Sequence, residues 1–144
     1  MGRTRIHLTE TIRAPLQLVF DRISDHEDMR NWPGVSDCRL VAEGQPRNGI
    51  GAVRAVKARG LTLHEKVVSF DPPDGFDYTI VKGLPVDHLG QVRLSEAGDQ
   101  TRIDWTVEMS SRIPLLAQLV GMILKRGLPS ALAHFKRETE RAAR

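Results

Sequence analysis

Four polar side chains, Arg54, Glu65, Tyr78 and His88, stand in stretches that otherwise alternate between apolar and polar residues. Every second residue of a strand lies on the same face, so each of the four is expected to share an inward face with apolar neighbours. An arginine and a carboxylate buried together must pair with each other or hold a polar ligand head, because an unpaired buried charge is costly. A structural ion pair and a ligand contact both stay open.

His88 is the best candidate for acid/base catalysis, since an imidazole titrates near neutral pH and could move a proton in a ring closure or a dehydration. Tyr78 is the second catalytic candidate, because its phenol could donate a hydrogen bond to a ligand carbonyl. The alternatives are structural: a histidine beside a loop that bonds a backbone carbonyl, and a tyrosine that belongs to the core.

Other chemistries find no support in the sequence. The five histidines show no paired metal-ligand spacing and Cys38 is the only cysteine, so we expect no metal site. The run Gly49-Ile50-Gly51 is too short for a dinucleotide-binding loop, and the sequence has neither a P-loop nor a Gly-x-Ser-x-Gly motif. We therefore expect no cofactor.

Short alternating runs separated by turn residues predict seven strands, six of them consecutive, which favours an antiparallel meander. The predicted strands are residues 3–12, 35–43, 49–58, 61–70, 76–82, 88–95 and 101–110. Two short helices, 15–23 and 27–31, are predicted between the first two strands, and Trp32-Pro33-Gly34 reads as a turn.

The stretch from Pro114 to Ala143 predicts the one long helix, since its apolar residues recur at three- and four-residue steps. Pro129 removes a helical hydrogen bond, so we expect a kink or break near Gly127-Leu128 that divides the helix into two pieces. The first piece, residues 115–124, is apolar nearly all round, which is typical of burial on several sides. It is too short to span a membrane.

The order of several short motifs resembles one superfamily. They are Ala14-Pro15, Val19-Phe20, Ile23-Ser24-Asp25, Trp32-Pro33, Gly51-Ala52-Val53-Arg54, Glu65-x-Val67, Asp71-Pro72-Pro73, Tyr78-x-Ile80 and Leu84-Pro85-Val86-Asp87-His88. Together they resemble the helix-grip (SRPBCC) superfamily of START and Bet v 1-like domains, and within it the polyketide cyclase/dehydrase-like branch. The resemblance implies an α+β fold in which a seven-stranded antiparallel sheet wraps around a long C-terminal helix and encloses a cavity for an apolar ligand.

Strand alternation then assigns side chains to that cavity. Ile50, Ala52 and Val56 carry Arg54 inward, but the strand with Glu65 is ambiguous, because Leu63 and Val67 favour one face whereas Val68 and Phe70 favour the other. The residues expected to contact ligand are Arg54, Glu65, Tyr78, Ile80, His88, Val92, Trp105, Val107 and Met109 from the sheet, and Leu119, Ile123 and Leu132 from the helix.

Composition and charge set the remaining expectations. The chain has 144 residues, of which 40% are hydrophobic and 27% charged, a composition that is ordinary for a single domain; we expect one domain over residues 1–144. The first residues lack the apolar core of a signal peptide, which favours a cytoplasmic protein. The net charge of +3 is uneven, with six Lys or Arg against two Glu in residues 125–144. Nucleic-acid binding is disfavoured because exposed aromatics and known motifs are absent; peripheral membrane contact stays open, and the sequence does not define an oligomeric state.

Two functions follow. The first is binding of a small hydrophobic ligand, such as a lipid, a quinone or a polyketide-like molecule, in the internal cavity. The alternative is a polyketide cyclase/aromatase-type enzyme, in which the same cavity folds a reactive chain while His88, with Arg54 or Tyr78, polarises a carbonyl and moves a proton. The superfamily implies no universal catalytic residue, so binding is favoured.

Overall fold

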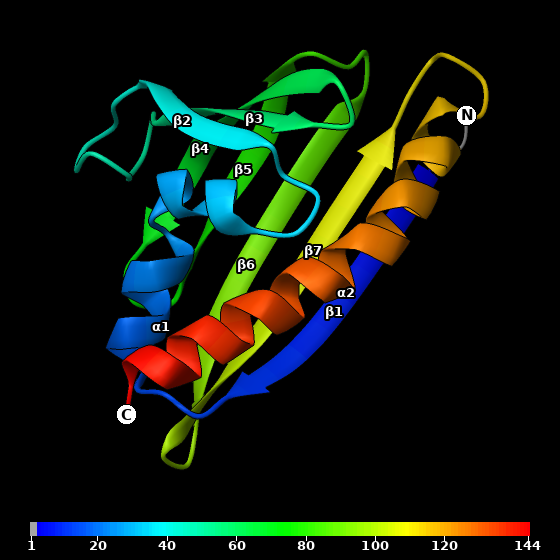
Figure 1. The fold of residues 1–144 in the computed structure, drawn as a ribbon. Helices are drawn as coiled ribbons and strands as arrows, with labels where there is room; N and C mark the ends of the chain where they lie inside the picture. The colour runs from blue at the N-terminus through cyan, green and yellow to red at the C-terminus, as the bar shows by residue number, and fades with distance from the viewer. Residues whose placement is uncertain (1–2) are drawn as a thin grey trace.

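A computed structural model describes residues 3–144 and shows one antiparallel sheet with a long helix across its concave face (Figure 1). The strand order is β1-β7-β6-β5-β4-β3-β2. The seven strands are β1 (Arg3–Ile12), β2 (Asp37–Ala42), β3 (Val53–Ala58), β4 (Leu61–Asp71), β5 (Gly75–Lys82), β6 (Asp87–Ala97) and β7 (Gln100–Ser110). Each corresponds to a predicted strand, so the helix-grip architecture expected from the sequence is confirmed.

The helices cover one face of the sheet. Helix α1 (Leu16–Ile23) and the 3-10 helix η1 (His26–Asn31) connect β1 to β2, and helix α2 (Leu116–Ala142) runs along β1 and β7, whereas η1 lies against β2 and β3 (Figure 1). Gly121 allows α2 to approach β1 closely, because a Cβ built at this position would lie 2.4 Å from Cγ2 of Thr4. The core therefore fills the space between the sheet and α2.

Helix α2 corrects two predictions. It is one continuous helix with Pro129 inside it, so a break into two pieces near Gly127-Leu128 is wrong, while a kink there stays a prediction. The predicted burial of residues 115–124 on several sides is also wrong, since Leu115, Leu119 and Met122 are exposed. The physical reason is that α2 rests on β1 and β7 through one stripe of residues, which includes the buried Ala117 and Gly121, and no other element of residues 3–144 covers its outer side.

A β-bulge resolves the ambiguity of the strand that carries Glu65. The register of β4 against β5 shifts between Val67 and Ser69, so Val68 is an extra residue. Val67 is buried and Val68 exposed, while Phe70 again packs against the core. The signals from Leu63, Val67 and Phe70 were therefore correct, each for its own half of the strand, whereas the signal from Val68 was wrong; Glu65 lies on the inward face with Val67.

The inward faces predicted for β5, β6 and β7 are buried as expected, except that Ile80 and His88 are only partly buried. The fully or nearly buried residues are Phe76, Tyr78, Val92, Leu94, Ile103, Trp105, Val107 and Met109. Ile50 is an exception to the prediction for the third strand, because it precedes β3 in a tight turn and is half exposed, whereas Arg54 and Val56 are buried. Within the described part of the chain, no helix combines the length and apolar character needed to cross a bilayer.

Candidate functional site

A cavity of about 220 Å³ lies where the sheet curves away from α2. The segment Met29–Val35 of η1 and its following turn forms one wall, and β3, β4 and the middle of α2 form the others. Most lining residues are apolar, and the polar groups that reach the cavity are Arg54, Arg59, Glu65 and Tyr78. The site therefore combines an apolar interior with a few polar groups from neighbouring strands, as ligand pockets commonly do.

Arg54 is the centre of the polar group. It lies directly opposite Glu65 in the β3–β4 register, and its Nε donates to Oε1 of Glu65 at 2.8 Å. Its Nη1 donates to Nδ1 of His26 at 3.1 Å, and its Cζ lies 4.6 Å from the centre of the Tyr78 ring. The side chain is only 3% exposed, and Glu65 neutralises its charge. The pair therefore adds two polar groups to the cavity wall but no net charge.

His26 accepts a hydrogen bond from Arg54 and must be neutral to do so. Its Nε2 donates to the backbone carbonyl of Asn48 at 2.9 Å, which leaves Nδ1 as the acceptor for Arg54. Burial, and secondly the charge of Arg54, lowers the pKa of His26 to about 3. The imidazole therefore carries one proton, fixed on Nε2, throughout the physiological pH range.

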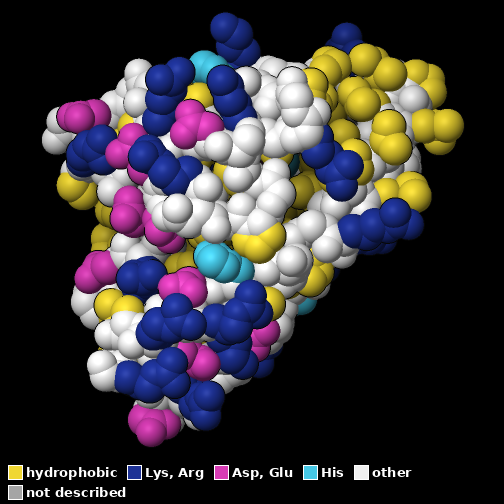
Figure 2. Space-filling view, in the orientation of Figure 1, with side chains coloured by type: hydrophobic (Ala, Val, Ile, Leu, Met, Phe, Trp, Pro, Cys, Tyr) yellow, Lys and Arg dark blue, Asp and Glu magenta, His cyan; other side chains and the backbone are white. Residues whose placement is uncertain are grey.

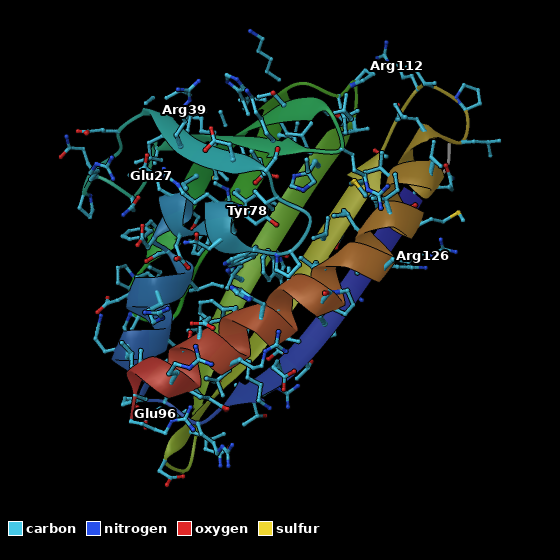
Figure 3. The ribbon with its side chains drawn as sticks, viewed as in Figure 1. Glu27, Arg39, Tyr78, Glu96, Arg112 and Arg126 are labelled. Atoms are coloured by element: carbon cyan, nitrogen blue, oxygen red, sulfur yellow. The ribbon has the colours of Figure 1, made fainter. Side chains whose placement is uncertain are left out.

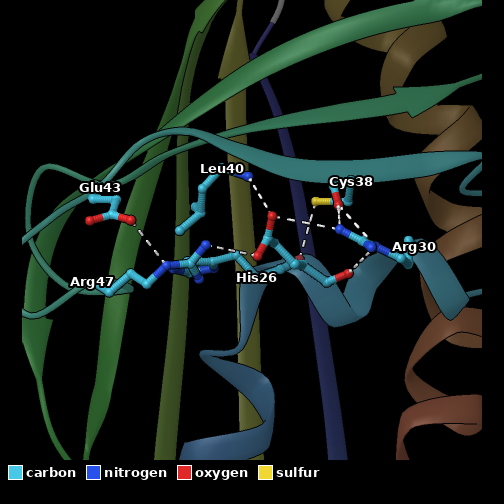
Figure 4. A network of polar contacts seen from close by, with 7 residues as sticks. His26, Arg30, Cys38, Leu40, Glu43 and Arg47 are labelled. Atoms are coloured by element: carbon cyan, nitrogen blue, oxygen red, sulfur yellow. Dashed lines mark hydrogen bonds and ion pairs between the residues drawn. The ribbon is translucent and has the colours of Figure 1, made fainter.

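Polar contacts fix the segment that carries His26 (Figure 4). Oε1 of Glu27 accepts from Arg47, while Oε2 accepts from the backbone amide of Leu40. Arg30 donates to the carbonyl of Cys38, and Sγ of Cys38 donates to the carbonyl of His26 at 3.1 Å. Burial raises the pKa of Cys38 to about 11, so the thiol stays protonated and can donate. This network joins η1 to β2 and to the loop before β3.

Tyr78 presents a hydrogen-bond donor to the cavity (Figure 3). Its Oη accepts from Nε1 of Trp105 at 2.9 Å, but in residues 3–144 no acceptor takes the phenol proton itself. Burial, and secondly Glu65, raises the pKa of Tyr78, so the phenol remains protonated. Gly90 makes room for the ring, since a Cβ there would lie 2.2 Å from Cζ of Tyr78. The phenol is thus oriented by the protein and free to donate.

Trp32 contributes an aromatic wall. Its ring lies edge-on to Trp105, with 6.0 Å between the centroids, and it also packs against Phe135. The indole Nε1 is buried and finds no partner among the described side chains and backbone groups. The wall between the cavity and the exterior therefore contains a donor that the protein itself leaves unsatisfied, which is uncommon for buried polar atoms.

The structure does not bring His88 to the cavity. Its Nδ1 accepts from the backbone amide of Ile80 at 3.2 Å, and its ring packs against Tyr78, with 5.4 Å between the centroids. Tyr78 lines the cavity, whereas His88 lines a separate surface depression with Arg3 and Asp87. Burial lowers the pKa of His88, so its charged form is disfavoured. Contrary to the prediction, His88 therefore does not line the cavity in which it was expected to contact a ligand.

The other predicted contact residues divide into three groups. Arg54, Glu65, Tyr78, Trp105 and Ile123 line the cavity. Four residues are buried but belong to the packed core outside the lining: Val92, Val107, Met109 and Leu132. Two residues predicted to contact the ligand lie away from the cavity: Leu119 faces outward on α2, and Ile80 lines a surface groove near the β5–β6 loop. For Leu119 the physical reason is that α2 lies directly on β1 and β7, so the opposite face of the helix points away from the sheet.

Sequence reasoning missed part of the lining. Met29 and Trp32 come from the segment that was predicted only as a short helix and a turn. Val35 was predicted only as the start of a strand, and Leu128 lies at the predicted kink or break in α2. His26 was considered only as a metal ligand. A tryptophan inside a Trp-Pro-Gly turn was the available signal, because so large an apolar side chain in a turn normally needs a partner surface.

Comparisons with known proteins agree with this geometry. Residues 3–140 match the family described as polyketide cyclase/dehydrase and lipid transport. A comparison with curated protein sequences gave no significant match. Among solved structures, the chain is similar to the ZhuI aromatase/cyclase from a Streptomyces species, with a TM-score of 0.85, 19% identity, and coverage of 99% of this chain and 97% of the other.

Two further structures share the fold. A START superfamily protein from Mycobacterium smegmatis has a TM-score of 0.80 at 14% identity, with 98% of this chain and 99% of the other covered. The protein Ara h 8.0201 has a TM-score of 0.77 at 18% identity, with coverage of 96% and 98%. Since these identities are low, the similarities establish the fold, and the family match extends over nearly the whole chain. This chain belongs to the polyketide cyclase/dehydrase and lipid transport family of the SRPBCC superfamily.

Proposed function

We propose that the cavity binds a neutral, mainly apolar ligand that accepts a hydrogen bond from Tyr78 through a carbonyl or similar oxygen. The observation that carries this proposal is the phenol of Tyr78, which lines the cavity, is oriented by Trp105 and has no acceptor for its own proton among the described residues. Quinones and polyketide-like molecules have such oxygens on an apolar framework. The lipid transport described for the family supports a binding role.

Charge and size narrow the ligand class. Arg54 and Glu65 neutralise each other, so a charged ligand would lose hydration without meeting an unpaired opposite charge from this pair. Arg59 also lines the cavity, but its side chain is exposed and therefore hydrated. The volume of 220 Å³ equals that of about seven waters in the liquid, at roughly 30 Å³ each. A bicyclic ligand fits this volume, whereas a longer molecule must extend beyond the cavity.

Paired bicyclic probes test the proposal directly. 1-Tetralone and tetralin have the same fused-ring skeleton, and only tetralone carries an acceptor oxygen. Trp32 and Trp105 both line the cavity, so quenching of tryptophan fluorescence reports binding of either probe. Wild type should prefer tetralone by about 2- to 12-fold, the worth of one net hydrogen bond.

The Tyr78→Phe variant should lose that preference and keep its affinity for tetralin, which makes tetralin the internal control. Binding of neither probe to wild type would refute an apolar binding cavity. Equal preference for tetralone in wild type and Tyr78→Phe would refute the role of the phenol. Native mass spectrometry of the purified protein, followed by solvent extraction, identifies any molecule that copurifies.

A cyclase or aromatase activity is the second candidate, and one observation favours it. Glu65 uses Oε1 for Arg54, while Oε2 accepts no hydrogen bond from residues 3–144, and Glu65 lines the same cavity as Tyr78. A carboxylate oxygen that removes a proton beside a phenol that stabilises the resulting enolate is the arrangement needed for an aldol-type ring closure. The aromatase/cyclase named among the similar structures supports this candidate at the level of the fold.

Incubation of the protein with a poly-β-ketone analogue, followed by mass spectrometry of the products, tests this second candidate. Ring closure by wild type that is lost in Tyr78→Phe, while tetralin binding persists, would establish catalysis. Cyclised product at the rate of a protein-free control would exclude it.

A further inference from the structure

Four large apolar side chains gather at one end of the molecule, where the β7–α2 loop enters α2. Ile113, Leu115, Leu119 and Met122 are 49%, 75%, 57% and 57% exposed, and we call these four residues the α2 tip. The three residues on the helix side are spaced by four and then three positions, so they share one face. Figure 2 shows hydrophobic side chains collected over this end. Exposed apolar clusters of this kind mark interaction surfaces.

The backbone at Leu115 is unusual for a leucine. Leu115 has a φ of 66°, in the left-handed region that β-carbon sterics disfavour for any residue except glycine, and it stands at the N-terminal cap of α2. Its side chain is the most exposed of the large hydrophobic residues described. Among residues 3–144 the strained conformation therefore does not bury the side chain of Leu115 and instead presents it to the exterior.

Cations border the α2 tip. Arg112 precedes it in the loop, and Lys125 and Arg126 follow it on the next helical turn; Arg112 and Arg126 are labelled in Figure 3. None of these three forms an ion pair with a side chain of residues 3–144, and the sequence contains no acidic residue between Glu108 and Glu138. Asp87 adds one negative charge in the groove that Ile113 and Arg112 line. The border is nevertheless clearly positive.

This combination fits one occupant better than others. A second copy of the chain would bring the same cations against each other, so a symmetric contact through the tip is opposed by like charges. A bilayer that contains anionic lipids offers an apolar layer for the tip and negative headgroups for its border, the pattern by which amphipathic helices bind in the membrane interface. The exposed tip of one helix is also a shape suited to shallow insertion.

We propose that the α2 tip docks this protein on anionic lipid membranes. The next turns of the same helix, at Ile123, Leu124 and Leu128, line the cavity. Docking therefore brings the cavity wall to the membrane interface, from which an apolar ligand can be taken or to which it can be delivered. This consequence rests on the proposed binding function, whereas the docking itself does not.

Vesicle flotation tests the proposal with the full chain. Two preparations are compared: phosphatidylcholine alone, and an equimolar mixture of phosphatidylcholine and phosphatidylglycerol. Wild type should float with the anionic vesicles, bind far less to the neutral ones, and dissociate as salt is added, because screening weakens the attraction between the cations and the lipid headgroups.

Two double variants separate the apolar and the charged contributions. Leu119→Ser with Met122→Ser should weaken binding by roughly tenfold or more, because both side chains are lost from the apolar layer. Lys125→Gln with Arg126→Gln should weaken it by roughly 30-fold, at about fivefold for each cation near an anionic surface. The matched controls are Val41→Ser with Val68→Ser, which are exposed on the sheet, and Arg137→Gln with Arg144→Gln; these should bind as wild type does.

Three results would overturn the proposal. The first is that wild type does not float with anionic vesicles. The second is that the tip variants and their controls lose vesicle binding equally. The third is that wild type forms a dimer in analytical ultracentrifugation and that the Leu119→Ser, Met122→Ser variant is a monomer. The last result would assign the tip to contacts between copies. The tip variants should also bind tetralin as wild type does. Tetralin binding therefore tests the cavity and vesicle flotation tests the tip, so failure of one proposal is distinguished from failure of the other.

Discussion

The neutral imidazole of His26 should make stability depend on pH in a way that can be measured. Burial, and secondly Arg54, lowers the pKa of His26 to about 3 from an ordinary value of 6.5. As the pH falls below about 6.5, the unfolded chain therefore takes up a proton that the folded chain refuses. The stability that this histidine contributes is complete above that pH and is lost progressively as the pH falls toward 3.

The size of the effect follows from the shift. Each pH unit below the unfolded pKa costs about 1.4 kcal/mol, so the free energy of unfolding should fall by about 2 kcal/mol between pH 8 and pH 5 through His26 alone. His26→Gln should remove this loss, because an amide can still accept from Arg54 and donate to the carbonyl of Asn48 but does not titrate.

Urea unfolding followed by tryptophan fluorescence at several pH values between 5 and 8 gives the comparison. His88 contributes in the same direction, since burial lowers its pKa. The free energy of unfolding of His26→Gln should therefore still depend on pH to some extent, and the double variant His26→Gln with His88→Gln should reduce this dependence further. Groups common to wild type and variant cancel in the difference. The same pH dependence in wild type and His26→Gln would show that His26 is not held neutral by burial and Arg54.

Three other substitutions have defined outcomes. Glu65→Gln leaves the buried charge of Arg54 without its partner and should lower the free energy of unfolding by about 3 to 5 kcal/mol in denaturant titrations; a loss below about 1 kcal/mol would show that water or another group already compensates Arg54. Gly90→Ala forces the ring of Tyr78 to move and should cost about 1 to 3 kcal/mol and abolish the preference for tetralone, whereas unchanged binding would contradict the close contact. Trp105→Ala should cost about 3 to 5 kcal/mol and weaken probe retention; a folded variant with unchanged affinity would remove Trp105 from the binding site.

Local alternation was enough to predict the strands and most of the inward faces. Trp105 and Tyr78 were placed correctly because each sits among apolar residues at every second position, and the sheet preserves that period. Arg54 was placed in the same way, whereas alternation left the face of Glu65 open; the pairing of the two across the strands follows from the short turn at Arg59-Gly60. These features depend on neighbours in the sequence.

The errors concern features that depend on distant segments. Leu119 is exposed because another face of α2 packs on β1 and β7, and the sequence of the helix alone does not determine which face packs there. His88 shares the expected face of its strand, but Tyr78 from the neighbouring strand occupies the cavity side. His26 becomes important only because the loop with Asn48 and the strand with Arg54 meet it from two sides.

The bulge at Val68 gives β4 a place where its length can change. Val68 and Ser69 are consecutive residues that both point away from the core, so a chain lacking Val68 would alternate regularly from Val67 to Phe70. Removal of a residue on either side of the bulge would instead turn half of the strand inside out. Related sequences can therefore gain or lose one residue at this point while Glu65 keeps its place beside Arg54 and Phe70 keeps its place in the core.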